Sequence, residues 1–62
     1  MQRNFTMTIR GQTVTVSAPQ GDVCLTADGQ RLDWQLTDNE WFDILEKGQS
    51  LGYETDDWAY SI

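Results

Sequence analysis

Apolar and polar side chains alternate with a period of two through the first 36 residues, and this alternation constrains the fold more than any other feature of the chain. Phe5, Met7 and Ile9 fall on one face of an extended segment, whereas Thr6 and Thr8 fall on the other. Successive side chains of a β-strand point to opposite faces, so this pattern is typical of strands with one buried face. We therefore expect the chain to begin with a half-buried sheet.

A turn is predicted where the first alternating segment ends. Gly11 and Gln12 fit a two-residue type II′ turn, which has glycine at its first central position. In this register, the predicted pairs on the apolar face are Ile9 with Val14, Met7 with Val16, and Phe5 with Ala18. A slip of one residue would move all of these side chains to the solvent face, so the hydrophobic pattern specifies which face is buried.

A second hairpin is predicted after a loop at residues 19–22. Asp28 and Gly29 form the dipeptide that favours a type I′ turn. The predicted pairs are Leu25 with Leu32 and Val23 with Trp34 on the apolar face, and Thr26 with Arg31 and Cys24 with Asp33 on the other face. Two consecutive hairpins predict an antiparallel meander whose apolar face needs a cover.

A helix that could provide this cover is predicted to begin at Thr37. Thr37 and Glu40 have the spacing of a capping box, in which each side chain bonds to the backbone N–H of the other residue. Trp41, Ile44 and Leu45 then recur at helical spacing. The sequence therefore predicts an amphipathic helix that buries this apolar stripe against the sheet.

The end of the helix and the C-terminal residues each leave two alternatives open. The helix could end at Gly48, or it could continue through Leu51 and end at Gly52. The second end is favoured because Gly48 and Leu51 extend the apolar stripe. Residues 53–62 could form a final strand, because apolar residues alternate there, or a short helix capped by Thr55.

The predicted fold class is α+β. It consists of two antiparallel β-hairpins, which form a four-stranded meander, packed against one amphipathic helix, with a possible C-terminal fifth strand. Residues 1–62 form a single small domain. Because Cys24 is the only cysteine and histidine is absent, neither an internal disulfide nor a structural zinc site is expected to support this small core. A well-packed core or self-association is expected instead.

Charge is distributed unevenly along the chain, whose formal net charge is −6. Residues 1–31 have a balance of +1 and residues 32–62 a balance of −7. This negative field repels nucleic acids and anionic membranes and attracts basic protein surfaces. We therefore expect a basic protein partner, with no direct nucleic-acid partner and no membrane partner. No segment has the apolar length of a membrane span or of a signal-peptide core, so a cytoplasmic location is expected.

Groups suited to catalysis are scarce. The chain has no histidine, no serine or cysteine motif with a nearby base, and no glycine-rich phosphate loop. Asp38 with Glu40, or Asp56 with Asp57, could in principle hold a divalent cation, but neither spacing matches an EF-hand loop. Glu54, Asp56 and Asp57 are the best candidate for a calcium-like cluster. No enzymatic activity, no cofactor and no metal are therefore predicted.

The acidic second half predicts a protein-binding surface, in which Tyr53 and Trp58 would be aromatic anchors. The predicted surface consists of Asp38, Glu40, Asp43, Glu46, Tyr53, Glu54, Asp56, Asp57 and Trp58. A surface that only keeps the protein soluble is the plain alternative.

In size, charge and lack of catalytic groups, the chain is similar to small acidic inhibitors encoded by phages and mobile elements. This resemblance implies a non-enzymatic inhibitor that works in the host cell cytoplasm. Its carboxylates would stand in for phosphates in the basic, nucleic-acid-binding groove of a host enzyme or defence complex. The second hypothesis is a structural or assembly protein that forms a homodimer or larger homo-oligomer through its strand edges or open sheet face.

Overall fold

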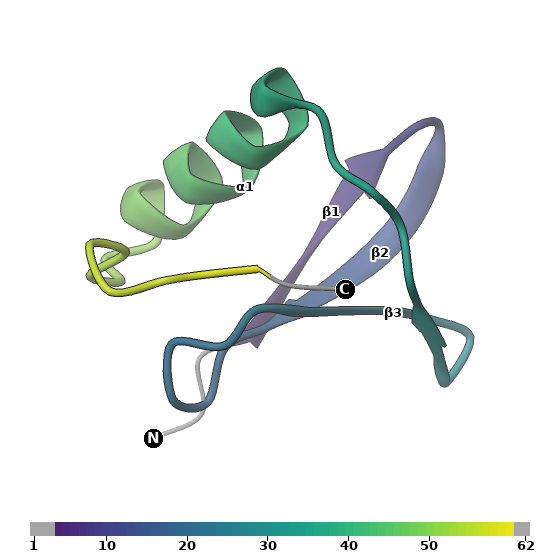
Figure 1. Ribbon diagram of the computed structural model, residues 1–62, viewed down its shortest axis with the longest axis horizontal. Coiled ribbons are helices and arrows are strands. Elements are labelled where there is room, and N and C mark those ends of the chain that lie inside the picture. Colours follow the sequence, from purple (N-terminus) through teal and green to yellow (C-terminus); the bar gives the residue numbers. More distant parts are fainter. Residues whose placement is uncertain (1–3, 61–62) are drawn as a thin grey trace.

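Four antiparallel strands form one sheet in the order in which they occur in the chain, and one helix lies over one face of that sheet (Figure 1). The computed structural model describes residues 4–60. Its elements are β1 (Asn4–Ile9), β2 (Gln12–Ser17), β3 (Cys24–Ala27), β4 (Gln30–Leu32) and α1 (Asp38–Ser50). The predicted α+β fold, a four-stranded antiparallel meander packed against one helix, is confirmed.

The turn between β1 and β2 differs from the predicted one. Its central residues are Arg10 and Gly11, with φ angles of 55° and 75°, so both are in the left-handed region as a type I′ turn requires. Met7 consequently pairs with Val14, and Phe5 pairs with Val16. The predicted register is wrong by two residues, because one glycine can serve either as the first residue of a type II′ turn or as the second of a type I′ turn. An even shift leaves each side chain on its predicted face.

The second hairpin follows the prediction at its turn and departs from it at its open end. Asp28 and Gly29 both have positive φ, as in a type I′ turn, and Leu25 pairs with Leu32 as predicted. The ladder of β3 and β4 ends at that pair. The two predicted pairs beyond it, Cys24 with Asp33 and Val23 with Trp34, therefore do not form. The backbone N–H of Val23 instead donates to the carbonyl of residue 59 in the C-terminal segment, at 2.9 Å.

The capping box at the start of α1 is confirmed. The backbone N–H of Glu40 donates to Thr37 Oγ1 at 3.2 Å, and the backbone N–H of Thr37 donates to the Glu40 carboxylate at 2.9 Å. The helix runs to Ser50, and Gly52 follows with a φ of 91°, so the favoured C-terminal end is correct. Leu51, which was expected to extend the apolar stripe, is 50% exposed. Within residues 4–60, no helix is long and apolar enough to cross a membrane.

Residues 53–60 form an irregular segment that runs back across the molecule between α1 and the sheet (Figure 1). A turn at residues 56–57 is followed by one parallel bridge between Asp22 and Ala59. The alternative of a short helix capped by Thr55 is therefore wrong. In the described part of this segment the possible fifth strand is reduced to that bridge, and residues 61–62 lie outside the described residues.

The core lies between the sheet and α1, and the C-terminal segment closes one side of it. Its buried apolar residues are Ile9, Val14, Val16, Ala18, Val23, Leu25, Ile44 and Trp58. Phe5 of β1 stacks on Trp58, with 6.1 Å between ring centroids. One indole thus contributes to the apolar centre of a molecule whose sheet supplies mainly aliphatic side chains.

Candidate functional site

Arg10 and Glu40 form an ion pair that joins the β1–β2 turn to the first turn of α1. Arg10 Nε and Nη2 donate to the two carboxylate oxygens of Glu40 at 2.7 and 3.0 Å. Nη2 also donates to the Gln35 carbonyl at 2.9 Å, and the guanidinium carbon lies 4.8 Å from the centroid of the Trp34 ring. Hydrogen bonds first from Arg10 and then from the backbone of Thr37 lower the pKa of Glu40 from 4.5 to about 2.

This ion pair changes the place of Glu40 in the predicted acidic surface. Its carboxylate caps α1 and balances the charge of Arg10, so it already has partners within the molecule. The two residues are 30 positions apart, and no local pattern connects them. The carboxylates that a partner protein could use are therefore those outside this pair.

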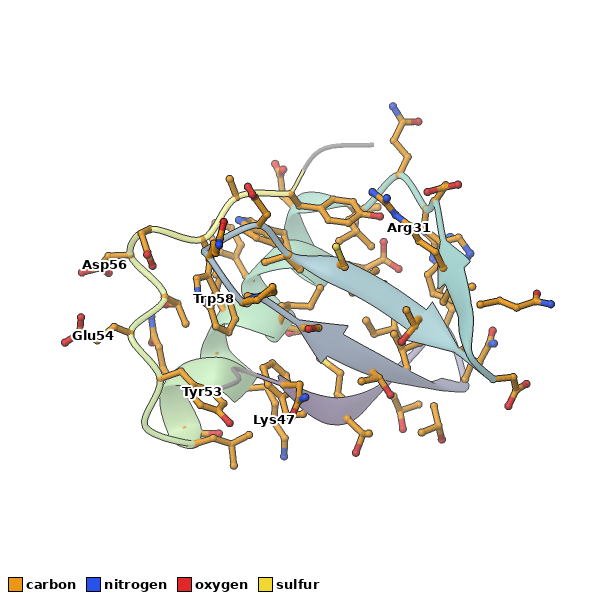
Figure 2. The ribbon with its side chains drawn as sticks, turned by 90° about the horizontal axis from the view of Figure 1, so that it is seen from below. Arg31, Lys47, Tyr53, Glu54, Asp56 and Trp58 are labelled. Atoms are coloured by element: carbon orange, nitrogen blue, oxygen red, sulfur yellow. The ribbon has the colours of Figure 1, made fainter. Side chains whose placement is uncertain are left out.

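The two predicted aromatic anchors lie in the core or against it. Trp58 is 7% exposed and its ring contacts Gly48 of α1, so the prediction of an exposed anchor is wrong for this residue. Its buried Nε1 has no hydrogen-bond acceptor among the described residues. Tyr53 is half-buried: its ring stacks on Phe5 at 6.0 Å, and its hydroxyl donates to the Asn4 carbonyl at 3.3 Å. Figure 2 shows Trp58 pointing into the molecule.

One exposed face of α1 carries carboxylates around a phenylalanine, and we call Asp38, Phe42, Asp43 and Glu46 the acidic face. All four side chains are exposed, and that of Phe42 is 63% exposed. Asp38, Phe42 and Glu46 follow each other at the spacing that places side chains on one side of a helix. Among residues 4–60, no basic side chain forms an ion pair with these three carboxylates.

Phe42 is the residue of this face that the sequence did not single out. In the sequence it falls at the edge of the apolar stripe, which leaves its exposure undecided. At 100° per residue, however, Phe42 lies about 40° from Glu46 and about 160° from Ile44 around the helix axis. That angular position is the signal that places it on the solvent side. Aromatic side chains, phenylalanine among them, are enriched at protein interfaces, so Phe42 is the candidate anchor of this face.

The remaining predicted acidic residues lie on the loop that follows α1. Glu54 and Asp56 are exposed and point away from the molecule (Figure 2). Asp57 packs against Gly21, where its carbonyl oxygen would lie 2.9 Å from a Cβ at position 21. Asp38 lies in the first turn of α1, whereas this loop follows the last turn. We therefore describe the predicted surface in two parts, the acidic face on α1 and a loop group.

A hollow of about 270 Å³ lies between the start of α1 and the C-terminal segment. It is lined by Leu36, Asp38, Trp41, Trp58, Ala59 and Tyr60. The rings of Trp41 and Tyr60 are tilted by 31° with 6.3 Å between centroids. The Tyr60 hydroxyl donates to the Trp34 carbonyl at 2.7 Å, and burial is the main cause of its raised pKa. The sequence did not predict this hollow, because two distant segments form its walls.

Within residues 4–60, no three histidine, cysteine, aspartate or glutamate side chains come close enough to hold a metal ion. The calcium-like arrangement of Glu54, Asp56 and Asp57 is therefore not formed. Cys24 is a half-buried free thiol on β3.

Comparison with protein-family models, with curated proteins and with solved structures gives no match. The function is therefore inferred from the surfaces and contacts of this chain.

Proposed function

We propose that the chain is a non-enzymatic protein-binding module, and that it inhibits a basic partner protein by occupying its surface. The observation that carries this proposal is the acidic face. Asp38, Asp43 and Glu46 are exposed around the uncovered ring of Phe42, and no described basic residue pairs with them. An aromatic anchor within a field of one charge suits a partner that has an apolar spot within a basic surface.

The arginines of the described structure do not offset this negative field. Arg10 is held by Glu40 at 2.7 Å, and Arg31 lies 3.5 Å from Asp33. Within α1 itself, Lys47 is the one basic residue against the carboxylates of Asp38, Glu40, Asp43 and Glu46, so the helix carries a net negative charge. A potential of this kind accelerates association with a surface of opposite charge, and salt weakens the effect.

The same features favour a groove that normally holds nucleic acid. Such grooves are lined with lysine and arginine side chains that neutralise phosphates. Carboxylates fixed on a helix can occupy the same positions, in the manner of the small acidic phage inhibitors that the chain is similar to. The proposed site of action is the cytoplasm, where such a host enzyme or defence complex would be found.

The test compares three forms of the protein as bait for host lysate at low salt. The parent chain is compared with a reversal variant, Asp43→Lys/Glu46→Lys, and with a control variant, Asp22→Lys/Asp33→Lys. Asp22 and Asp33 are exposed and lie outside α1. Each variant replaces two carboxylates with two lysines, so both variants change the net charge equally. Circular dichroism first establishes that all three forms are folded.

We expect the parent and the control variant to capture the same partner protein from the lysate. The reversal variant should not capture it. A nucleic-acid oligonucleotide should compete with the parent for that partner. Equal retention by the parent and the reversal variant would contradict the proposal. If the oligonucleotide does not reduce the amount of partner that the parent chain captures, the nucleic-acid-binding groove is not the binding site.

Self-association is the second candidate function, and the observation that favours it is the sheet face opposite α1. Thr6, Thr15 and Thr26 lie side by side across three neighbouring strands on this face, with Cys24 also on it. Within residues 4–60, no helix or strand covers it. Light scattering across a hundredfold dilution tests this candidate. A dimer mass that falls on dilution supports assembly, and a constant monomer mass excludes it.

A further inference from the structure

The hollow between α1 and the C-terminal segment combines aromatic walls with a carboxylate at its edge. Trp41 and Tyr60 contribute neighbouring rings, with 6.3 Å between their centroids, and Leu36 adds an aliphatic surface. Asp38 also lines the hollow and belongs to the acidic face, so the two features are continuous. Aromatic rings next to a carboxylate form a favourable environment for a flat organic cation.

The protein already holds one arginine in an environment of this kind. The Arg10 guanidinium lies 4.8 Å from the centroid of the Trp34 ring, and it pairs with Glu40 in the first turn of α1. The hollow has an equivalent set of groups, namely the rings of Trp41 and Tyr60 and a carboxylate from the same helical turn. No described cation pairs with Asp38.

The start of a helix is usually unfavourable for a cation, because the helix dipole is positive there. Arg10 shows that this turn nevertheless accepts a guanidinium, which donates to both carboxylate oxygens of Glu40. The volume of about 270 Å³ is also sufficient for one long side chain. The size, charge and aromatic lining of the hollow therefore all favour a flat organic cation on a long side chain.

We propose that this hollow is the site for one arginine side chain of the partner protein. The guanidinium lies over Trp41 or Tyr60 and pairs with Asp38, and its aliphatic stem packs on Leu36. This inference rests on the proposed function and refines it, because it names the side chain that the partner inserts next to the acidic face. Arginine is preferred to lysine, since a planar guanidinium stacks on rings and bonds to a carboxylate through two N–H groups.

The experiment titrates the full chain with blocked pentapeptides that have arginine, lysine or citrulline between glycines. Indole and tyrosine side-chain NMR signals report the site. The arginine peptide should shift the Trp41 and Tyr60 signals in a saturable way. Citrulline has the same shape without the charge and should bind at least about fivefold more weakly. Equal binding of citrulline or of lysine would overturn the assignment to a guanidinium.

Three variants separate the hollow from general negative charge. Asp38→Asn should lower the affinity for the arginine peptide about fivefold. Ala59→Leu should fill the hollow and so abolish the saturable NMR shifts. Ala59 is exposed, so the larger side chain can be accommodated without disturbing the core. Asp28→Asn removes the same charge from the β3–β4 turn, away from both the hollow and the acidic face, and should change the affinity by less than about twofold. Equal effects of Asp38→Asn and Asp28→Asn would reject the site.

The partner protein distinguishes failure of this inference from failure of the proposed function. In one outcome, the Ala59→Leu variant binds the partner as tightly as the parent chain does, and the reversal variant no longer binds the partner. The arginine site is then wrong, and the acidic face remains supported. If the reversal variant retains the partner and the arginine peptide still saturates the hollow, the acidic face is wrong and the arginine site stands.

Discussion

Gly48 of α1 and the indole of Trp58 are in direct contact, and a Cβ at position 48 would lie 2.8 Å from Trp58 Cη2 and 3.1 Å from Thr55 Cγ2. This contact explains why a glycine occupies the buried side of a helix that it weakens. It also explains how the irregular C-terminal segment reaches the core. The absence of a side chain at position 48 lets the Trp58 ring pack directly on the helix backbone.

Replacing Gly48 with alanine tests this contact, because two effects then oppose each other. Alanine improves helix propensity by about 1 kcal/mol, whereas the clash with a core ring costs about 1–3 kcal/mol. We expect the clash to prevail, since the Trp58 atoms belong to a rigid ring enclosed by Phe5 and α1. The free energy of unfolding in urea should therefore fall in Gly48→Ala.

A second substitution shows whether the clash is the cause. Phenylalanine at position 58 lacks the outer indole atoms that approach Gly48. Gly48→Ala combined with Trp58→Phe should therefore be less destabilised than the sum of the two single variants. Additive effects, or a stabilising Gly48→Ala substitution, would show that the two residues are not tightly packed.

The pH dependence of stability tests the ion pair of Arg10 and Glu40. The pKa of Glu40 in the folded state is about 2, below its ordinary value of 4.5. Ionised Glu40 therefore stabilises the fold above pH 4.5, and this contribution disappears as the pH falls towards 2. Glu40→Gln should be less stable than the parent at pH 7, and urea unfolding should show the difference shrinking between pH 4.5 and 2.

Asp43→Asn is the matched control for that measurement, because it removes one carboxylate of α1 that has no ion pair among the described residues. Its stability relative to the parent measures the loss of a helix carboxylate that lies outside the ion pair. A Glu40→Gln difference that stays constant from pH 7 to 2 would contradict the role of the charge.

The N-cap contributes separately from this ion pair. Thr37 Oγ1 accepts the backbone N–H of Glu40 at 3.2 Å. Thr37→Ala should lower the free energy of unfolding by about 1 kcal/mol, whereas Thr37→Ser retains the hydroxyl and should lose less than half of that. Thermal unfolding followed by circular dichroism measures both. Equal losses would show that the hydroxyl does not act as the cap.

The parts of the fold that follow from local patterns were predictable from the sequence. Alternation assigns Val14 and Val16 to the buried face whether or not the exact register is known, because an even shift preserves the face. The Asp28-Gly29 turn and the Thr37–Glu40 capping box each depend on residues within four positions of each other. Local chemistry decides such features.

The parts that depend on distant segments were not predictable. Arg10 reaches Glu40 across 30 positions, and this contact removes one predicted carboxylate from the binding surface. Trp58 is buried because Gly48 leaves room for it, although its sequence neighbours are acidic. The hollow likewise needs the start of α1 and the C-terminal segment together. No periodicity in the sequence reports these pairings.

The acidic face of α1 is the proposed binding surface for the partner protein. Its most direct test is the dissociation constant of the captured partner for the parent, the reversal variant and the control variant at 50 and 300 mM salt. We predict that the reversal variant weakens binding about 100-fold, or about 2.7 kcal/mol, at low salt, and that higher salt reduces this difference. The control variant should stay within about fivefold of the parent. Equal weakening by the reversal and control variants would contradict the account, because net charge alone would then explain the binding.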